Sequence, residues 1–140
     1  FAALDKLKDL REVRLFYAIV DDARVQPELS ALGDLPALEN LQIGGDFGPA
    51  DIEPLRKCKT LRKLRLWGGG FTDDSTAATI GELQGLTELT LSDNCVITDV
   101  GALALAKLPS LQKLRVGGFV TRAGGMELAK IPLLRSLLIV

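Results

Sequence analysis

The chain has 140 residues, 47% of them hydrophobic and 25% charged, which suits one globular domain and excludes a disordered chain. Its 17 basic and 18 acidic residues give a net charge of -1, so no overall field favours nucleic acid or an anionic membrane. The apolar stretches are shorter than the roughly 20 residues that cross a bilayer, and two cysteines are too few for a secreted disulfide framework. We therefore expect a cytoplasmic protein without a membrane segment.

One pattern recurs six times in register along the chain: leucine-x-x-leucine-x-x-leucine-x-leucine, with aliphatic replacements. Successive copies begin 23 to 28 residues apart, a spacing typical of stacked repeat units. The last two positions of each copy alternate with one residue between them, which predicts a short strand with one apolar face. The six pairs are Val13 and Leu15, Leu41 and Ile43, Leu64 and Leu66, Leu89 and Leu91, Leu114 and Val116, and Leu137 and Ile139.

The segments between the predicted strands differ in length and character. Residues 19–34 form the longest segment, which we expect to bulge from the stack, and glycines 68–70 mark a second flexible junction. Residues 99–108 and 124–131 have apolar side chains at helical spacing, so we expect short helices there.

Helix boundaries can be predicted from capping residues and prolines. Thr98 or Asp99 is suited to cap the first of the two helices, and Thr121 the second. A proline follows the first position of three units, where a helix should end and the chain become extended: Pro36, Pro109 and Pro132.

Three stretches, VITDVGALALAKLPSLQKLRV at 96–116, FTDDSTAATIGELQGLTELTL at 71–91 and VTRAGGMELAKIPLLRSLLI at 120–139, share one phase. The chain resembles the cysteine-containing, Ile-Thr-Asp type of leucine-rich repeat. In that class one cysteine opens the strand pattern, as Cys58 does, and another precedes Ile-Thr-Asp, as Cys95 does.

This resemblance implies an α/β fold, a right-handed horseshoe solenoid of about six repeats that occupies residues 1–140. It implies a concave parallel sheet, with short helices or irregular segments on the convex side. It also implies protein binding, since leucine-rich repeats generally bind proteins. Because neither end of the chain reads as a polar capping unit, we expect flanking repeats or domains in a longer protein.

The strand positions between and after the buried pairs should form three columns on the concave surface. The first column is Glu12, Asn40, Lys63, Glu88, Lys113 and Ser136; the second is Arg14, Gln42, Arg65, Thr90, Arg115 and Leu138; the third is Phe16, Gly44, Trp67, Ser92, Gly117 and Val140. Five basic residues stand against two acidic ones on this surface, which favours a partner with an acidic surface.

The candidate partner-binding residues are Arg14, Phe16, Lys63, Arg65, Trp67, Glu88, Lys113 and Arg115. Trp67 is the expected anchor, because tryptophan and arginine are enriched at interface hot spots. Each candidate also has a structural interpretation. Trp67 could cover Gly44 or Ser92, Phe16 could pack with Tyr17 and the 19–34 loop, and Lys63, Glu88 and Lys113 could form a neutralising ladder.

Catalysis, metals and cofactors are not expected. The chain has no histidine, which removes the commonest general acid-base residue. We interpret Cys58 and Cys95 as small buried apolar residues, and Asp73-Asp74 and Asp21-Asp22 as turn formers or helix caps. The glycines at 44–48 and 68–70 lack the lysine of a phosphate-binding loop.

The sequence thus favours a protein-binding module over two alternatives. One alternative is the substrate-recognition arm of an enzyme, such as a ubiquitin ligase, whose catalytic part lies outside the chain; members of the similar class often have this role. The other is a structural spacer without a ligand. Nucleic acid is not favoured, because acidic residues interrupt the basic ones.

Overall fold

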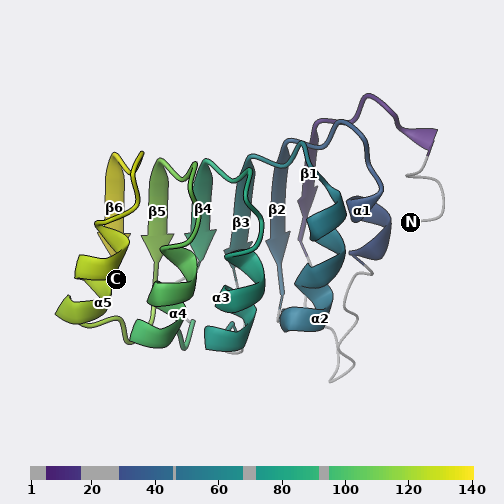
Figure 1. Ribbon diagram of the computed structural model, residues 1–140. Coiled ribbons are helices and arrows are strands. Elements are labelled where there is room, and N and C mark those ends of the chain that lie inside the picture. The colour runs from purple at the N-terminus through teal and green to yellow at the C-terminus, as the bar shows by residue number, and fades with distance from the viewer. Residues whose placement is uncertain (1–5, 17–28, 46, 68–71, 92–94) are drawn as a thin grey trace, which may run out of the picture.

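The computed structural model describes residues 6–16, 29–45, 47–67, 72–91 and 95–140. Within these residues the chain forms one sheet of six parallel strands that lie side by side in chain order (Figure 1). The strands are β1 (Glu12–Leu15), β2 (Asn40–Gly44), β3 (Lys63–Trp67), β4 (Glu88–Leu91), β5 (Lys113–Val116) and β6 (Ser136–Ile139). The six predicted strands are therefore confirmed.

Each strand pairs with the next at equivalent positions of the repeat. Arg14 lies opposite Gln42, Gln42 opposite Arg65, Arg65 opposite Thr90, and Thr90 opposite Arg115. Because side chains alternate along a strand, this register keeps every buried pair on one side of the sheet and every intervening residue on the other. The first two predicted columns are confirmed.

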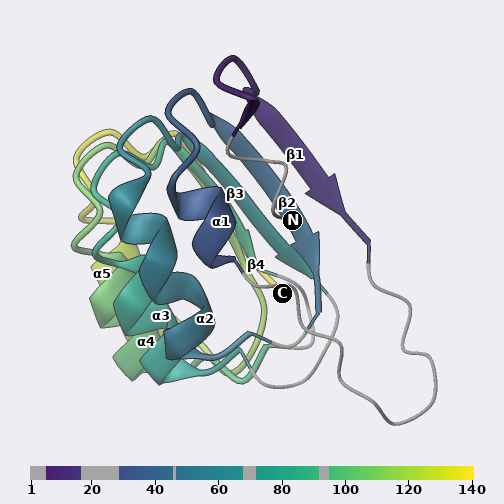
Figure 2. The ribbon, with the colours of Figure 1, turned by 90° about the vertical axis from the view of Figure 1, so that its right-hand side faces the viewer.

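Short helices return the chain between strands, and they all cover the same side of the sheet (Figure 2). They are α1 (Ser30–Gly33), α2 (Pro49–Ile52), the 3-10 helix η2 (Glu53–Lys57), α3 (Asp74–Ile80), α4 (Asp99–Leu105) and α5 (Arg122–Leu128). In the described part of the chain, none of these helices has the length and apolar character needed to cross a membrane.

The predicted caps and stops are largely confirmed. Thr98 caps α4 by accepting from the Val100 amide, so Asp99 is the first helical residue and not the cap. Thr121 caps α5 in the same way, through the Ala123 amide. The three prolines all lie beyond a helix end. Of the segment 19–34, residues 19–28 with Asp21-Asp22 lie outside the described residues, as do the glycines 68–70, and residues 30–33 form α1.

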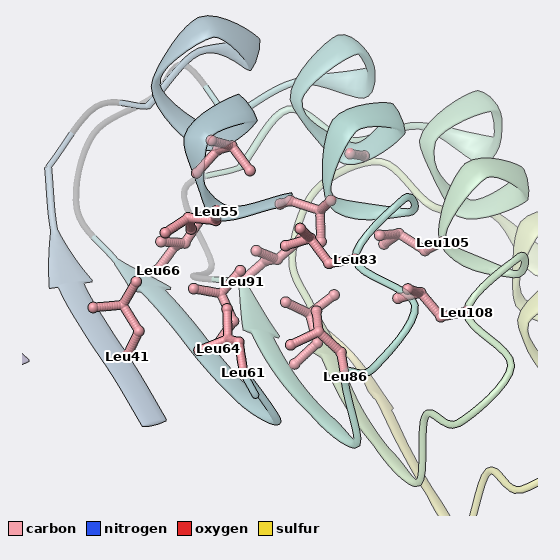
Figure 3. Packing of buried hydrophobic residues seen from close by; sticks show 14 of the residues in the cluster. Leu41, Leu55, Leu61, Leu64, Leu66, Leu83, Leu86, Leu91, Leu105 and Leu108 are labelled. Carbon is pink, nitrogen blue, oxygen red and sulfur yellow. The ribbon is translucent and has the colours of Figure 1, made fainter. Parts of the chain in front are cut away.

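The core fills the space between the sheet and the helices (Figure 3). In the inner units the strand leucines are buried: Leu41, Leu64 and Leu89 are at most 1% exposed. Leu105 of α4 is fully buried and faces this layer. Burying each such side chain contributes about 1.5–3 kcal/mol, so these stacked leucine side chains are the main source of stability.

At both ends of the stack the same positions are more open. Leu7 in the first unit is 47% exposed, and Leu137 and Ile139 in the last are each 36% exposed. A unit buries its apolar residues against both neighbours, and the outer units of this structure have only one.

An aspartate links α3 to the unit that follows it. The carboxylate of Asp74 accepts from the Thr98 amide at 2.7 Å, the Thr98 hydroxyl at 2.6 Å and the Gly101 amide at 3.0 Å. A Cβ on Gly101 would lie 2.5 Å from Asp74 Oδ1, so only glycine leaves room for the carboxylate. The charged acceptor therefore satisfies backbone donors at the start of α4 that the helix itself cannot.

The same link recurs one unit later. Asp99 accepts from the Thr121 amide at 2.8 Å, the Thr121 hydroxyl at 2.6 Å and the Gly124 amide at 3.2 Å. A Cβ on Gly124 would collide with Asp99 Oδ1. Hydrogen bonds from the Thr121 hydroxyl and then its amide lower the pKa of Asp99. The aspartate of the Ile-Thr-Asp sequence is thus an inter-unit acceptor.

The preceding unit explains why α3 differs. Asp73 caps α3 by accepting from the Thr76 amide, as predicted, and hydrogen bonds from Ser75 and Thr76 lower its pKa. Thr76 occupies the position of Gly101, and its buried hydroxyl donates to the Phe47 carbonyl at 3.2 Å. The unit before carries Pro49 where the next two carry aspartate, so no carboxylate needs that space.

Candidate functional site

All eight candidate residues lie on the face of the sheet opposite the helices, which we call the concave face. On this face Arg14, Lys63, Arg65, Lys113, Arg115 and Phe16 are exposed, while Trp67 and Glu88 are half-buried. Each lies next to a buried or partly buried strand residue. The period-two pattern of the sequence therefore accounts for their common side.

Two aromatic rings meet on this face although their strands are not neighbours. The ring centroids of Phe16 and Trp67 lie 5.2 Å apart, with the planes inclined at 53°. Gly44 stands between them on β2, and a Cβ there would lie 2.8 Å from Trp67 Nε1. Strands β1 and β3 are about 9.6 Å apart at the usual strand spacing, so the rings lean together over the glycine.

This contact changes how both aromatic residues are interpreted. Trp67 covers Gly44, as the alternative to partner binding predicted. Its side chain nevertheless remains half-buried rather than enclosed. Phe16 packs on Trp67 and is still 74% exposed. Its expected packing on Tyr17 lies outside the described residues. The aromatic pair was not predicted from the sequence; the available signal was the one small residue, Gly44, between two aromatic positions of the third column.

Arg65 stands beside the aromatic pair. Its guanidinium carbon lies 5.5 Å from the centroid of the Trp67 ring, within the range of a cation–π interaction. Its neighbours across the sheet are uncharged, Gln42 on one side and Thr90 on the other. The arrangement joins a positive charge to an exposed aromatic surface.

Arg14 is differently placed. It forms an ion pair with Glu12 at 2.7 Å, and the same carboxylate oxygen accepts from the Asn40 side chain at 3.2 Å. Both partners of the ion pair are exposed, so water screens it and it contributes at most about 1 kcal/mol. Arg14 therefore remains available to a partner that competes with Glu12.

The first column forms the predicted ladder. Lys63 and Lys113 lie 3.6 Å and 3.5 Å from the same oxygen of Glu88. One carboxylate faces two ammonium groups, so the ladder is neutralised only in part and keeps a positive charge. Arg115 lies beside it in the second column, opposite Thr90.

The buried thiols take no part in this face. Cys58 is 7% and Cys95 4% exposed, which confirms their assignment to the core. The Cys58 thiol lies 3.5 Å from the Leu38 carbonyl. Within the described ranges, no three acidic, cysteine or histidine side chains gather as metal ligands would. Gly45, which follows β2, has a φ of 152°, a backbone conformation that only glycine adopts readily.

Comparison with known proteins identifies the architecture. Residues 84–106 match the family model described as Leucine Rich repeat. The chain is similar to the structure of a leucine-rich-repeat protein of Leptospira interrogans, at 18% identity and a TM-score of 0.58, covering 95% of this chain and 38% of that one. It is also similar to an internalin of Listeria monocytogenes, at 15% identity and a TM-score of 0.51, covering 96% and 49%.

The chain thus spans less than half the length of both solved structures. No curated protein sequence matches it. The fold is that of a leucine-rich-repeat solenoid of about six repeats, with the parallel sheet on its concave side. Identities this low establish the fold alone, and the cysteine-containing subclass stays a prediction.

Proposed function

We propose that this solenoid is a protein-binding module that holds its partner on the concave face, around Phe16, Arg65 and Trp67. Leucine-rich-repeat folds are generally protein-protein interaction modules, which supports the class of function. The proposal assigns no catalytic step to this chain, and the cytoplasmic location remains a prediction.

The aromatic pair carries the proposal. Phe16 is 74% exposed although its ring already packs against Trp67, so a large apolar surface remains in contact with water. Arg65 adjoins it through its cation–π contact. Interface hot spots are enriched in tryptophan and arginine, and burying such a cluster under a partner releases the water that covers it.

The charges support a partner with an acidic surface. Five basic side chains of the concave face stand against Glu12 and Glu88, whereas the whole chain has a net charge of -1. Complementary charge raises the association rate more than it raises affinity. The aromatic pair would then supply most of the affinity.

Affinity capture from extracts of cells that express the protein tests the proposal. The chain is compared with Trp67→Ala/Arg65→Ala and with a convex control, Leu103→Ala/Arg122→Ala, all checked as folded by circular dichroism. We expect a protein that the unchanged chain and the convex control retain and that the concave double variant loses.

Equal retention by all three chains would place the contact away from Trp67 and Arg65 and contradict the proposal. Retention lost only in the convex control would assign the site to the helices. A failure of all three to retain any protein would favour a structural spacer.

A further inference from the structure

Arginines occupy every second strand of one column on the concave face. Arg14, Arg65 and Arg115 lie on β1, β3 and β5, while Gln42 and Thr90 lie between them on β2 and β4. Parallel strands are spaced at about 4.8 Å, so successive arginine positions are about 9.6 Å apart. The concave face thus presents a regular series of positive positions along the solenoid.

Few polypeptide conformations repeat at that distance on a single side. In a β-strand residues three apart are about 10 Å apart but point to opposite faces. In an α-helix, residues seven apart share a face at about 10.5 Å. A polyproline II helix has three residues per turn and a rise of 3.1 Å, so every third side chain returns to the same side after about 9.3 Å. This conformation matches the arginine spacing most closely.

The aromatic pair is aligned with the first two of these arginines. Phe16 follows Arg14 by two residues and Trp67 follows Arg65 by two residues, so the same two strands carry both features. In a three-fold helix the residues between two aligned side chains point to either flank. One of them would therefore lie toward the ring pair, above Gly44.

We propose that the concave face binds an acidic protein segment in polyproline II conformation that crosses the strands. A carboxylate at every third residue lies over the arginine column, and a bulky apolar residue next to the first carboxylate packs on Phe16 and Trp67. This inference rests on the proposed function and specifies the chemistry of its partner.

The acidic residues of the face favour such a segment over a nucleic-acid strand. Glu12 pairs with Arg14, and Glu88 stands between Lys63 and Lys113. A phosphate at every nucleotide would meet these carboxylates and be repelled. A peptide with a carboxylate only at every third residue places uncharged residues over β4, opposite Glu88, and its carboxylate at Arg14 competes with Glu12.

Two labelled synthetic peptides of identical composition test the inference by fluorescence anisotropy. The spaced peptide has glutamate at every third position, one leucine after the first glutamate and proline elsewhere; the clustered peptide has its glutamates side by side. We expect the spaced peptide to bind about tenfold more tightly, and Arg65→Gln to weaken it about tenfold, because the charge pattern decides specificity. Arg122→Gln, an exposed arginine of α5, is the matched control and should leave binding unchanged.

Equal affinity for the two peptides, or unchanged binding in Arg65→Gln, would overturn the inference. Tighter binding of an oligothymidylate than of the spaced peptide would overturn it as well. Capture that still depends on Trp67 and Arg65 would show in either case that the proposed function survives with a different partner chemistry.

Discussion

On the helix side of the solenoid, two successive units carry an aspartate at the same position and use it in the same way, whereas the third concave column carries different side chains in successive units. Asp74 and Asp99 make the same three hydrogen bonds to the next unit. In the third concave column, by contrast, a phenylalanine, a glycine and a tryptophan stand at equivalent positions of successive units.

This difference separates what builds the molecule from what it can bind. A repeated contact satisfies the same backbone groups in each unit that receives it, here those of α4 and α5, so its stabilisation adds along the stack. In the described part of the chain, the side chains of the third concave column make no such repeated contact. A departure from the repeat on that face is therefore informative, and Phe16, Gly44 and Trp67 together form such a departure.

The largest effect is expected where the two faces share a core. Leu89→Ala should lower the free energy of unfolding by about 3 kcal/mol, because it leaves a cavity at a position that is only 1% exposed. Leu103→Ala, on the outer side of α4 and 49% exposed, should change it by less than about 0.5 kcal/mol. Equal denaturation midpoints for the two variants would refute the register of the sheet.

The repeated aspartate link is tested by two adjacent glycines of α5. Gly124→Ala should cost about 1–2 kcal/mol, because the new methyl group collides with the Asp99 carboxylate. Gly125→Ala meets only the end of the Ile139 side chain at 3.2 Å, and alanine's helix propensity should leave stability unchanged or raise it by about 0.5 kcal/mol. If calorimetry shows the same loss of stability in both variants, the Asp99 carboxylate does not require glycine at position 124.

A smaller effect should appear in acid. The Thr121 hydroxyl and amide lower the pKa of Asp99, so the folded protein binds that proton less tightly than the unfolded chain. The stability that the ionised Asp99 carboxylate provides is present above the ordinary aspartate pKa of about 4. It is lost as the pH falls through the lowered pKa of Asp99 in the folded protein. Thermal midpoints of the unchanged chain and Asp99→Asn should therefore differ at neutral pH and converge below about pH 4. A difference that stays constant with pH would contradict this reasoning.

The smallest effect on stability is expected on the concave face. Glu88→Gln should change the free energy of unfolding by less than about 0.5 kcal/mol, because its two lysine partners are exposed and the ion pairs are screened. The same substitution makes the face more positive and should tighten binding of the spaced acidic peptide. A large loss of stability would show that the concave face, like the helix side, stabilises the stacking of the units.

The sequence predicted most of the fold because the fold is periodic. Equal phase in every copy of the pattern aligns Val13, Leu41, Leu64 and their counterparts across the sheet, so no long-range information was needed. The helix caps of Thr98 and Thr121 are likewise local, because each hydroxyl accepts from an amide two residues further along the chain. Such contacts can be read from spacing alone.

Contacts between units were not predictable in the same way. Asp74 reads as a local helix cap, and only the structure shows that its donors lie 24 and 27 residues away. The meeting of Phe16 and Trp67 depends on side-chain rotamers that lean across a strand. In both cases a glycine, Gly101 or Gly44, was the available signal, because it leaves space for a side chain from elsewhere.

Site-specific photocrosslinking tests the central claim most directly. A photoreactive phenylalanine analogue is placed at position 16 on the concave face or at position 126 on the helix side, where Phe16 and Met126 are 74% and 61% exposed. In extracts of cells that express the protein, we expect one protein to crosslink from position 16 and not from position 126. Crosslinking from position 126 alone would contradict the account, because it would place the partner on the face that we assign to building the stack.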